Sequence, residues 1–236
     1  MKKQILFIAF LCAQLFCNIT IASAQKNTYK VGDFYCDDDK MGVVFWVDES
    51  GQRGKIVSLE ESPRLAWTTD GYEIGNTSQT YNKENGAVNM MMIQIEGGWK
   101  RKFPAFAWCA ELGDEWYIPA IEELKMFTLN KEVYEAVSNT LFECFQLGAT
   151  PLANGGEYGY WSSTEVEAMV IAEVVDGVEV DRDSSSPKHP EIPVVRMGTN
   201  NSWHEWSFPK YHEFCVRAVA TFGPRHETMV VMPLGY

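Results

Sequence analysis

Apolar and polar positions in the first part of the chain predict a β-hairpin followed by a long loop. Residues 43–47 are a run of β-branched and aromatic residues, residues 49–51 (Glu-Ser-Gly) supply a turn, and residues 55–59 bring the chain back. Residues 68–86 are polar and contain several Gly, Asn, Thr and Ser, which indicates a loop.

Helical spacing follows in three segments. The first covers residues 103–112 and stops at Gly113, the second begins at Pro119, and the third covers residues 132–145 after a break near Asn130. The positions expected to face the core in the first two helices are Phe103, Phe106, Ala107, Ala110, Ile121, Leu124 and Phe127.

The stretch WYIP, residues 116–119, stands at the start of the second helix. Proline favours the first helical position because its missing N–H is not needed there. Glu122 and Glu123 then fall in the first turn, where acidic residues complement the helix dipole. We expect the rings before the proline to cover the crevice between two helices, as a buried joint without a chemical role.

After Gly155 the pattern changes to strands. They are predicted in YGYWSSTE, on both sides of an Asp176-Gly177 turn, in VVRMGT and in HEFCVRAVATF, with a polar loop over residues 183–193. The last of these strands alternates Phe214, Val216, Ala218 and Ala220. Strands, then helices, then strands, without βαβα alternation or a Gly-rich phosphate loop, indicate a single α+β domain.

Residues 1–24 have the pattern of a secretory signal peptide. Two lysines form a short positive region, residues 5–16 are apolar, and residues 22–24 (Ala-Ser-Ala) provide a cleavage site. We therefore expect residues 25–236 to be an exported domain, in the periplasm, at the outer surface or secreted, without membrane insertion.

The composition limits the classes of partner. Apolar residues make up 46% of the chain and charged residues 22%, an ordinary globular balance. The formal charge of −12 becomes −14 when the two lysines of the signal are removed. Such a surface repels nucleic acid phosphates and anionic lipid headgroups, so nucleic acid is not an expected partner.

No catalytic or metal-binding pattern is complete. HEWSF at His204 lacks the second histidine of H-E-x-x-H, and there is no G-x-S-x-G. An EF-hand loop starting at Asp37 would place Met41 where an oxygen ligand is needed. We predict no catalytic residue, no metal and no cofactor. The oligomeric state cannot be predicted from these patterns.

Four cysteines remain after removal of the signal: Cys36, Cys109, Cys144 and Cys215. An exported protein with an even number of cysteines usually pairs them. Three pairings are possible, and the spacing of these cysteines does not choose among them.

Three motifs in order, FAWCAELGDEWYIPAIEEL, YWSSTE and FCVRAV, resemble the DUF1566 family. That family is also met as the C-terminal domain of a Legionella collagen-like adhesin and as a Fibrobacter paralogous domain, and it is similar to C-type lectin-like domains. The hairpin GVVFWVDESGQRGKIVSLEE resembles the Bacteroidetes variety, and the resemblance covers about residues 31–222. It implies paired N- and C-terminal strands, two or three helices on a small, mostly antiparallel sheet, and long irregular loops.

The resemblance also implies two disulfides, but this sequence lacks the calcium motifs of sugar-binding lectins. In lectin-like domains a cysteine of the first helix bonds one on the last strand, which implies Cys109–Cys215 and leaves Cys36–Cys144. The calcium motifs of sugar-binding lectins, Glu-Pro-Asn or Gln-Pro-Asp and then Trp-Asn-Asp, are replaced here by PEIP and NSWHEW. Any ligand binding is therefore expected to be independent of calcium.

The segment GTNNSWHEWSF provides the candidate ligand site. Exposed Trp rings flanked by amides suit stacking on sugar rings, and they also suit protein hot spots. The candidate residues are Asn200, Asn201, Trp203, His204 and Trp206. We predict an exported, non-catalytic protein that binds a glycan or a cell-surface protein. The alternative is a structural or assembly component of a cell-envelope complex without a small ligand, and a third alternative is an enzyme. If the segment has no binding role, we expect at least one of the two Trp rings to cap the core beneath a loop.

Overall fold

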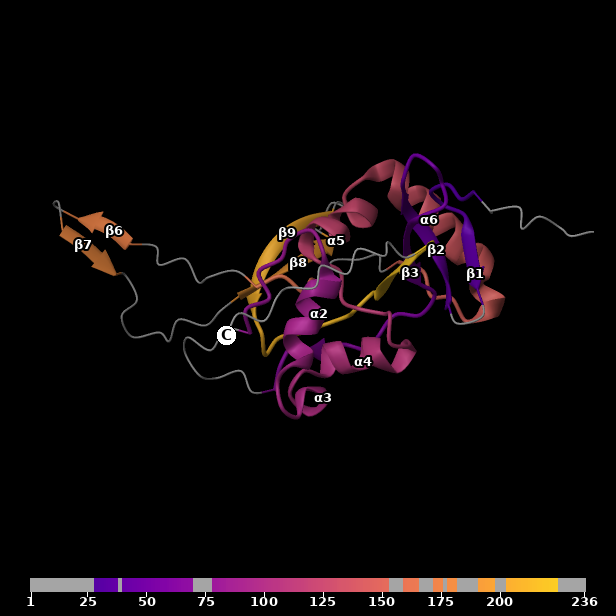
Figure 1. Ribbon diagram of the computed structural model, residues 1–236. Coiled ribbons are helices and arrows are strands. Elements are labelled where there is room, and N and C mark those ends of the chain that lie inside the picture. The colour runs from indigo at the N-terminus through magenta and orange to yellow at the C-terminus, as the bar shows by residue number, and fades with distance from the viewer. Residues whose placement is uncertain are drawn as a thin grey trace, which may run out of the picture.

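The computed structural model describes residues 28–37, 40–69, 78–152, 159–165, 172–175, 178–181, 191–197 and 203–224 (Figure 1). Within these residues the fold is α+β, with five α-helices and small antiparallel sheets. The helical elements are α2 (Gly86–Gln94), α3 (Trp99–Lys102), α4 (Pro104–Leu112), α5 (Ile121–Thr128), α6 (Lys131–Glu143) and the 3₁₀ turn η1 (Cys144–Leu147).

The predicted hairpin forms the centre of a four-stranded antiparallel sheet in the order β1-β2-β3-β11. Its strands are β1 (Phe34–Asp37), β2 (Lys40–Val47), β3 (Gly54–Ser58) and β11 (Val219–Phe222). The β2–β3 turn is closed by a backbone hydrogen bond from Gly51 to Asp48, and Gly51 takes a positive φ of 65° that favours glycine. The strands β1 and β11 lie at opposite edges, so the first and last strands are not paired as the family resemblance implied.

The helices α5 and α6 pack against each other and against β2. The rings of Phe45 in β2 and Phe127 in α5 lie 5.2 Å apart and join the two layers. Asn130 caps α6 with its side-chain oxygen, which accepts from the backbone of Glu132 and Val133, where the sequence indicated a break. The prediction for α4 is confirmed, whereas α5 begins at Ile121, two residues later than predicted.

The helices α2 and α3 were not predicted, because residues 68–86 were assigned to a loop and residues 87–102 to no element. The α2 sequence GAVNMMMIQ is apolar on several sides and therefore shows no one-sided helical pattern. The available signal was Asn85, whose side chain accepts from the Ala87 N–H as a helix cap. A Cβ on Gly86 would lie 2.2 Å from the Ile118 carbonyl oxygen, so only glycine permits this contact with the WYIP stretch.

The WYIP stretch is a buried joint, as predicted. Trp116, Tyr117 and Ile118 are all buried, and Tyr117 exchanges two backbone hydrogen bonds with Val219 of β11. The carbonyl of Pro119 accepts from the backbone of Ser163 at 2.8 Å. The stretch therefore connects the start of α5 to the last strand and to the segment after β5 (Gly159–Trp161).

The remaining strands form three small sheets. The first pairs β4 (Leu65–Ala66) with β10 (Glu213–Phe214), and the second is the hairpin of β6 (Ala172–Val175) and β7 (Val178–Asp181). The third has the order β5-β8-β9, where β8 is Glu191–Met197 and β9 is Trp203–Pro209. The strand β8 begins inside the predicted loop 183–193, and β9 was not predicted.

The predicted closing strand is interrupted between β10 and β11. Backbone hydrogen bonds join Cys215 to Gly159 and Trp161, and the Val216 N–H donates to the hydroxyl of Ser62. Cys215 thus contacts β5 and Val216 contacts the segment between β3 and β4, so the chain leaves the β4–β10 pair here before it joins β3 as β11.

None of the helices in the described ranges is both long enough and apolar enough to cross a bilayer. The predicted signal peptide, residues 1–24, lies outside the described residues.

Candidate functional site

Of the five predicted ligand residues, the structure describes the side chain of Trp206. It is 54% exposed and lies in β9, an edge strand of its sheet. The backbones of Trp203 and His204 belong to the same strand, while their side chains and both residues Asn200 and Asn201 lie outside what is described.

An ion pair joins β9 to α5 at the residue that precedes Trp206. Glu205 accepts from the ammonium of Lys125 in α5 at 2.6 Å, and Lys125 also contacts Glu122 at 3.0 Å. These contacts join β9 to the outer face of α5. Glu205 and Trp206 are consecutive residues of β9, so the ion pair and the exposed ring lie on opposite faces of the strand. The predicted amides lie outside the described residues.

Neither predicted disulfide is formed in the structure, in which all four cysteines are free. Cys109 is fully buried on α4, whereas the Cys215 thiol lies beside the carboxylate of Glu61. Cys36 is exposed on the edge strand β1, and Cys144 is buried at the start of η1. Within each predicted pair, the two cysteines therefore lie in different surroundings.

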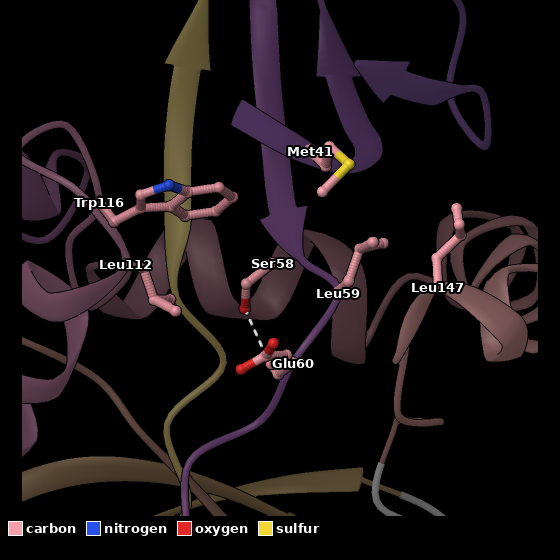
Figure 2. Close-up of a pocket in the computed structure, with 7 residues that line it drawn as sticks. All are labelled: Met41, Ser58, Leu59, Glu60, Leu112, Trp116 and Leu147. Atoms are coloured by element: carbon pink, nitrogen blue, oxygen red, sulfur yellow. Dashed lines mark hydrogen bonds between the residues drawn. The ribbon is translucent and has the colours of Figure 1, made fainter. Parts of the chain in front are cut away.

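A small pocket opens between the ends of β2 and β3, the end of α4, and η1 (Figure 2). Its volume is about 170 Å³. Five of its seven lining residues are apolar, and Glu60 is the one charged residue among them. The lining residues are Met41, Ser58, Leu59, Glu60, Leu112, Trp116 and Leu147. The Ser58 hydroxyl donates to the Glu60 carbonyl at 2.7 Å, and this bond fixes the backbone at the pocket floor.

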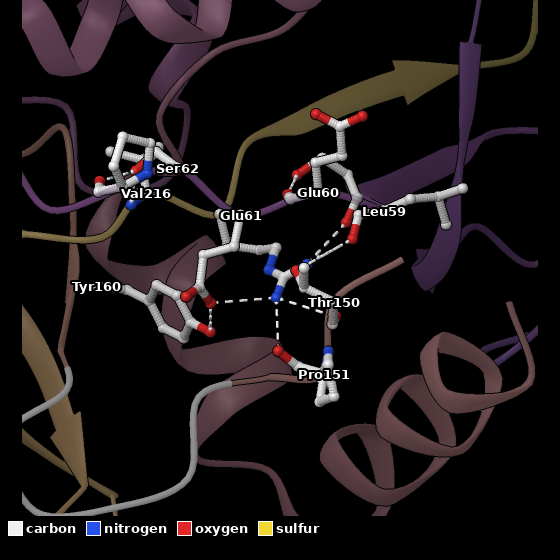
Figure 3. Close-up of polar contacts among 11 residues, drawn as sticks. Leu59, Glu60, Glu61, Ser62, Thr150, Pro151, Tyr160 and Val216 are labelled. Carbon is white, nitrogen blue, oxygen red and sulfur yellow. Dashed lines mark hydrogen bonds and ion pairs between the residues drawn. The ribbon is translucent and has the colours of Figure 1, made fainter. Parts of the chain in front are cut away.

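The buried Arg217 holds the wall of this pocket in place, and its partners Leu59, Thr150 and Pro151 are labelled in Figure 3. Arg217 is fully buried, and its guanidinium donates to the carbonyls of Ser58 and Leu59 at 3.2 and 2.9 Å. It also donates to the carbonyls of Thr150 and Pro151 at 3.2 and 2.8 Å. One side chain thus ties the end of β3 to the segment that follows η1.

The charge of Arg217 is balanced by Glu61. The guanidinium lies 3.1 Å from the Glu61 carboxylate, which also accepts from the hydroxyl of Tyr160. A buried ion pair with this many hydrogen bonds is a fixed structural element, because moving either charge would leave the other without compensation.

A second buried carboxylate has donors on both oxygens. Glu123 in α5 is fully buried, and one oxygen accepts from Lys55 at 2.6 Å and from the Tyr117 hydroxyl at 3.1 Å. The other oxygen accepts from the backbones of Gly86 and Ala120 at 2.9 and 2.8 Å. The group joins β3, α2, α5 and the WYIP stretch, and this arrangement suits a structural role.

A third buried pair lies near the Trp67 ring. The ammonium of Lys210 contacts the Glu165 carboxylate and lies 4.7 Å from the centre of the ring of Trp67. Burial lowers the pKa of Lys210, and the charge of Glu165 offsets part of this shift. The Glu165 carboxylate also accepts from the backbone of Ser78 at 2.9 Å, so its second oxygen is engaged as well.

Alkaline conditions are expected to destabilise this core. Burial raises the pKa of the Cys109 thiol well above its usual range, raises that of Cys215 to about 12, and raises that of the Tyr117 phenol, with help from Glu123. These groups keep their protons in the folded protein at a pH where the unfolded chain has lost them, from about pH 8.5 for Cys and about pH 10 for Tyr.

The stability from these groups is complete below about pH 8.5 and declines above it, by up to about 1.4 kcal/mol per group for each further pH unit. Urea unfolding at several values between about pH 7 and about pH 11 measures the decline. A free energy of unfolding that stays constant over this range would contradict the expected shifts.

No group of three or more His, Cys, Asp or Glu side chains in the described ranges is placed to hold a metal ion. The pocket residues were also not singled out by the sequence. They come from four separate segments, and none of these segments has a local pattern that marks a binding site.

Comparison of the chain with profiles of known protein families, with curated protein sequences and with solved structures gave no significant match.

Proposed function

We propose that this chain is an exported, non-catalytic binding protein with a lectin-like α+β fold, and that its ligand is a glycan or a cell-surface protein. The observation that carries the proposal is the exposed ring of Trp206 on the edge strand β9. Trp is enriched at binding hot spots because it combines a large apolar face with an N–H donor.

The buried charges support a scaffold without catalysis. Glu123 and Arg217 lie in the interior and are each held by several hydrogen bonds from or to the backbone. A catalytic carboxylate or cation needs access to a substrate, and these two groups are fully buried. Binding is proposed to be independent of calcium, because the sequence lacks the calcium motifs of sugar-binding lectins.

Replacing Trp206 with alanine should abolish ligand retention without unfolding the protein. The ring is mostly exposed, so its removal leaves no cavity, and the free energy of unfolding should change by no more than about 0.5 kcal/mol. Retention on a glycan array, with and without a calcium chelator, measures the effect on sugar ligands. Retention on intact cells tests surface proteins.

Trp46 provides the matched control, because it is 40% exposed on β2 and belongs to a different sheet. Trp46→Ala should keep full retention. If Trp206→Ala and Trp46→Ala both retain ligand as well as the parent, the proposed site is wrong. Loss of retention with the chelator alone would contradict calcium independence.

The alternative function, a structural component of a cell-envelope complex, is supported by a different observation. Phe142 and Phe145 are 76% and 65% exposed at the end of α6 and in η1, and Leu147 is also exposed. Clustered exposed apolar residues are typical of protein interfaces.

A further inference from the structure

We propose that the pocket between β2, β3, α4 and η1 is a docking site for a basic protein segment that inserts one apolar side chain. This site is separate from the Trp206 surface and does not depend on the function proposed above.

The size of the pocket favours a single side chain. Pockets for cofactors and drug-sized ligands typically have volumes of about 300–1,000 Å³. A cavity of about 150 Å³ accommodates one benzene ring. The present pocket, at about 170 Å³, therefore matches one phenyl or branched aliphatic group and not a larger small molecule.

The mouth of the pocket is apolar and open to solvent. Met41 and Leu147 line it and are both exposed, and Phe145 lies two residues before Leu147 in the same 3₁₀ turn. Phe142 precedes this turn at the end of α6 and is among the most exposed apolar residues described. A docked segment would cover Met41 and Leu147 and add contact area around its anchor.

The charges at the pocket select a basic partner. Glu60 lines the pocket, and the exposed Glu143 lies between Phe142 and Phe145 in sequence. The nearby cation Lys40 is paired with Glu115, so this pair adds no net charge. An Arg or Lys next to the apolar anchor could pair with Glu60.

The same charges argue against a second copy of this chain as the occupant. Two copies facing each other through this surface would bring two acidic surfaces together, and each chain has a formal charge of −12. Like charges across an interface destabilise it, whereas a basic segment gains from the same field.

The walls of the pocket are held by core contacts. Arg217 fixes the backbone of Ser58 and Leu59 from behind, and Trp116 on the opposite side is buried in the core. A rigid pocket loses little conformational entropy on binding, which favours recognition of a short segment.

Methyl NMR of the purified chain, labelled at its methionines, tests the proposal with three blocked peptides. The probes are acetyl-Gly-Arg-Phe-Arg-Gly-amide, the same peptide with Ala in place of Phe, and the same peptide with Glu in place of both Arg. The Met41 methyl signal, assigned with Met41→Leu, should shift saturably with the first peptide, with a dissociation constant of roughly 1–10 mM. The Ala peptide should bind about tenfold more weakly, because it lacks the ring that fills the pocket.

A matched pair of charge reversals separates the site from the general field. Glu60→Lys should weaken the binding of the first peptide at least about fivefold, because it places at the pocket a charge of the same sign as the peptide's arginines. Glu49→Lys makes the same change in net charge at the exposed turn of the β2–β3 hairpin, away from the pocket. It should weaken the binding of the first peptide less than about twofold. Thermal unfolding of both variants confirms that each is folded.

Three results would overturn the proposal. The first is an equal Met41 shift with all three peptides, and the second is an equal loss for Glu60→Lys and Glu49→Lys. The third is a dimer, seen by sedimentation, that dissociates in Leu147→Asn, because the occupant would then be a second copy of the chain. A saturable shift that needs both the ring and the arginines, and that Glu60→Lys removes, supports it.

Discussion

Arg217→Ala should lower the free energy of unfolding by about 3–5 kcal/mol, the range measured when one partner of a buried ion pair is removed. The guanidinium is fully buried and donates to four backbone carbonyls, at Ser58, Leu59, Thr150 and Pro151. Its removal leaves these carbonyls without that donor and leaves the mostly buried Glu61 without its cation.

Urea unfolding followed by tryptophan fluorescence measures the loss. Arg64→Ala is the control, because Arg64 is exposed and makes one backbone hydrogen bond to Glu213, and it should change the free energy by no more than about 1 kcal/mol. Equal losses in the two variants would show that the Arg217 network contributes no special stability.

Glu123→Ala should lower the free energy of unfolding by about 3–5 kcal/mol, because it also removes a buried charged group with several hydrogen-bond partners. This carboxylate accepts from the backbones of Gly86 and Ala120, from the Tyr117 hydroxyl and from Lys55. Without it, two backbone donors at the start of α2 and α5 and a buried hydroxyl lose their acceptor, and the junction of these helices should loosen.

The adjacent Glu122→Ala is a sensitive control. Glu122 lies in the same first turn of α5 but is exposed, and its ion pair with Lys125 is of a kind worth no more than about 1 kcal/mol. Both variants are compared by urea unfolding at the same pH. If Glu122→Ala loses as much stability as Glu123→Ala, the distinction drawn here between the buried and the exposed carboxylate is wrong.

The sequence predicted those elements whose pattern comes from burial on one side. The hairpin β2–β3 was predicted because its β-branched run and turn residues are local signals, and α4 and α6 were predicted from helical spacing. The helix α2 was not predicted, because its methionines and other apolar residues give no polar face. The strand β9 was not predicted, because a half-exposed edge strand with Glu205, Trp206 and Ser207 has no alternating apolar pattern.

Long-range contacts explain what was missed at the candidate sites. In FCVRAV, Arg217 stands in an apolar run, and no local pattern indicates that it is buried against carbonyls of residues 58–59 and 150–151. The pocket likewise depends on segments around residues 41, 59, 114 and 147 that meet only in the folded chain. Trp206, in contrast, was predicted as a candidate because an aromatic residue among polar neighbours is itself a local signal.

Ligand retention and the free energy of unfolding, measured on one preparation of Trp206→Ala, separate binding from folding. We assign ligand binding to this exposed ring and stability to buried groups such as Arg217. We therefore expect retention to be lost while the free energy of unfolding stays within about 0.5 kcal/mol of the parent. Full retention, or a loss of retention that accompanies unfolding, would contradict this assignment.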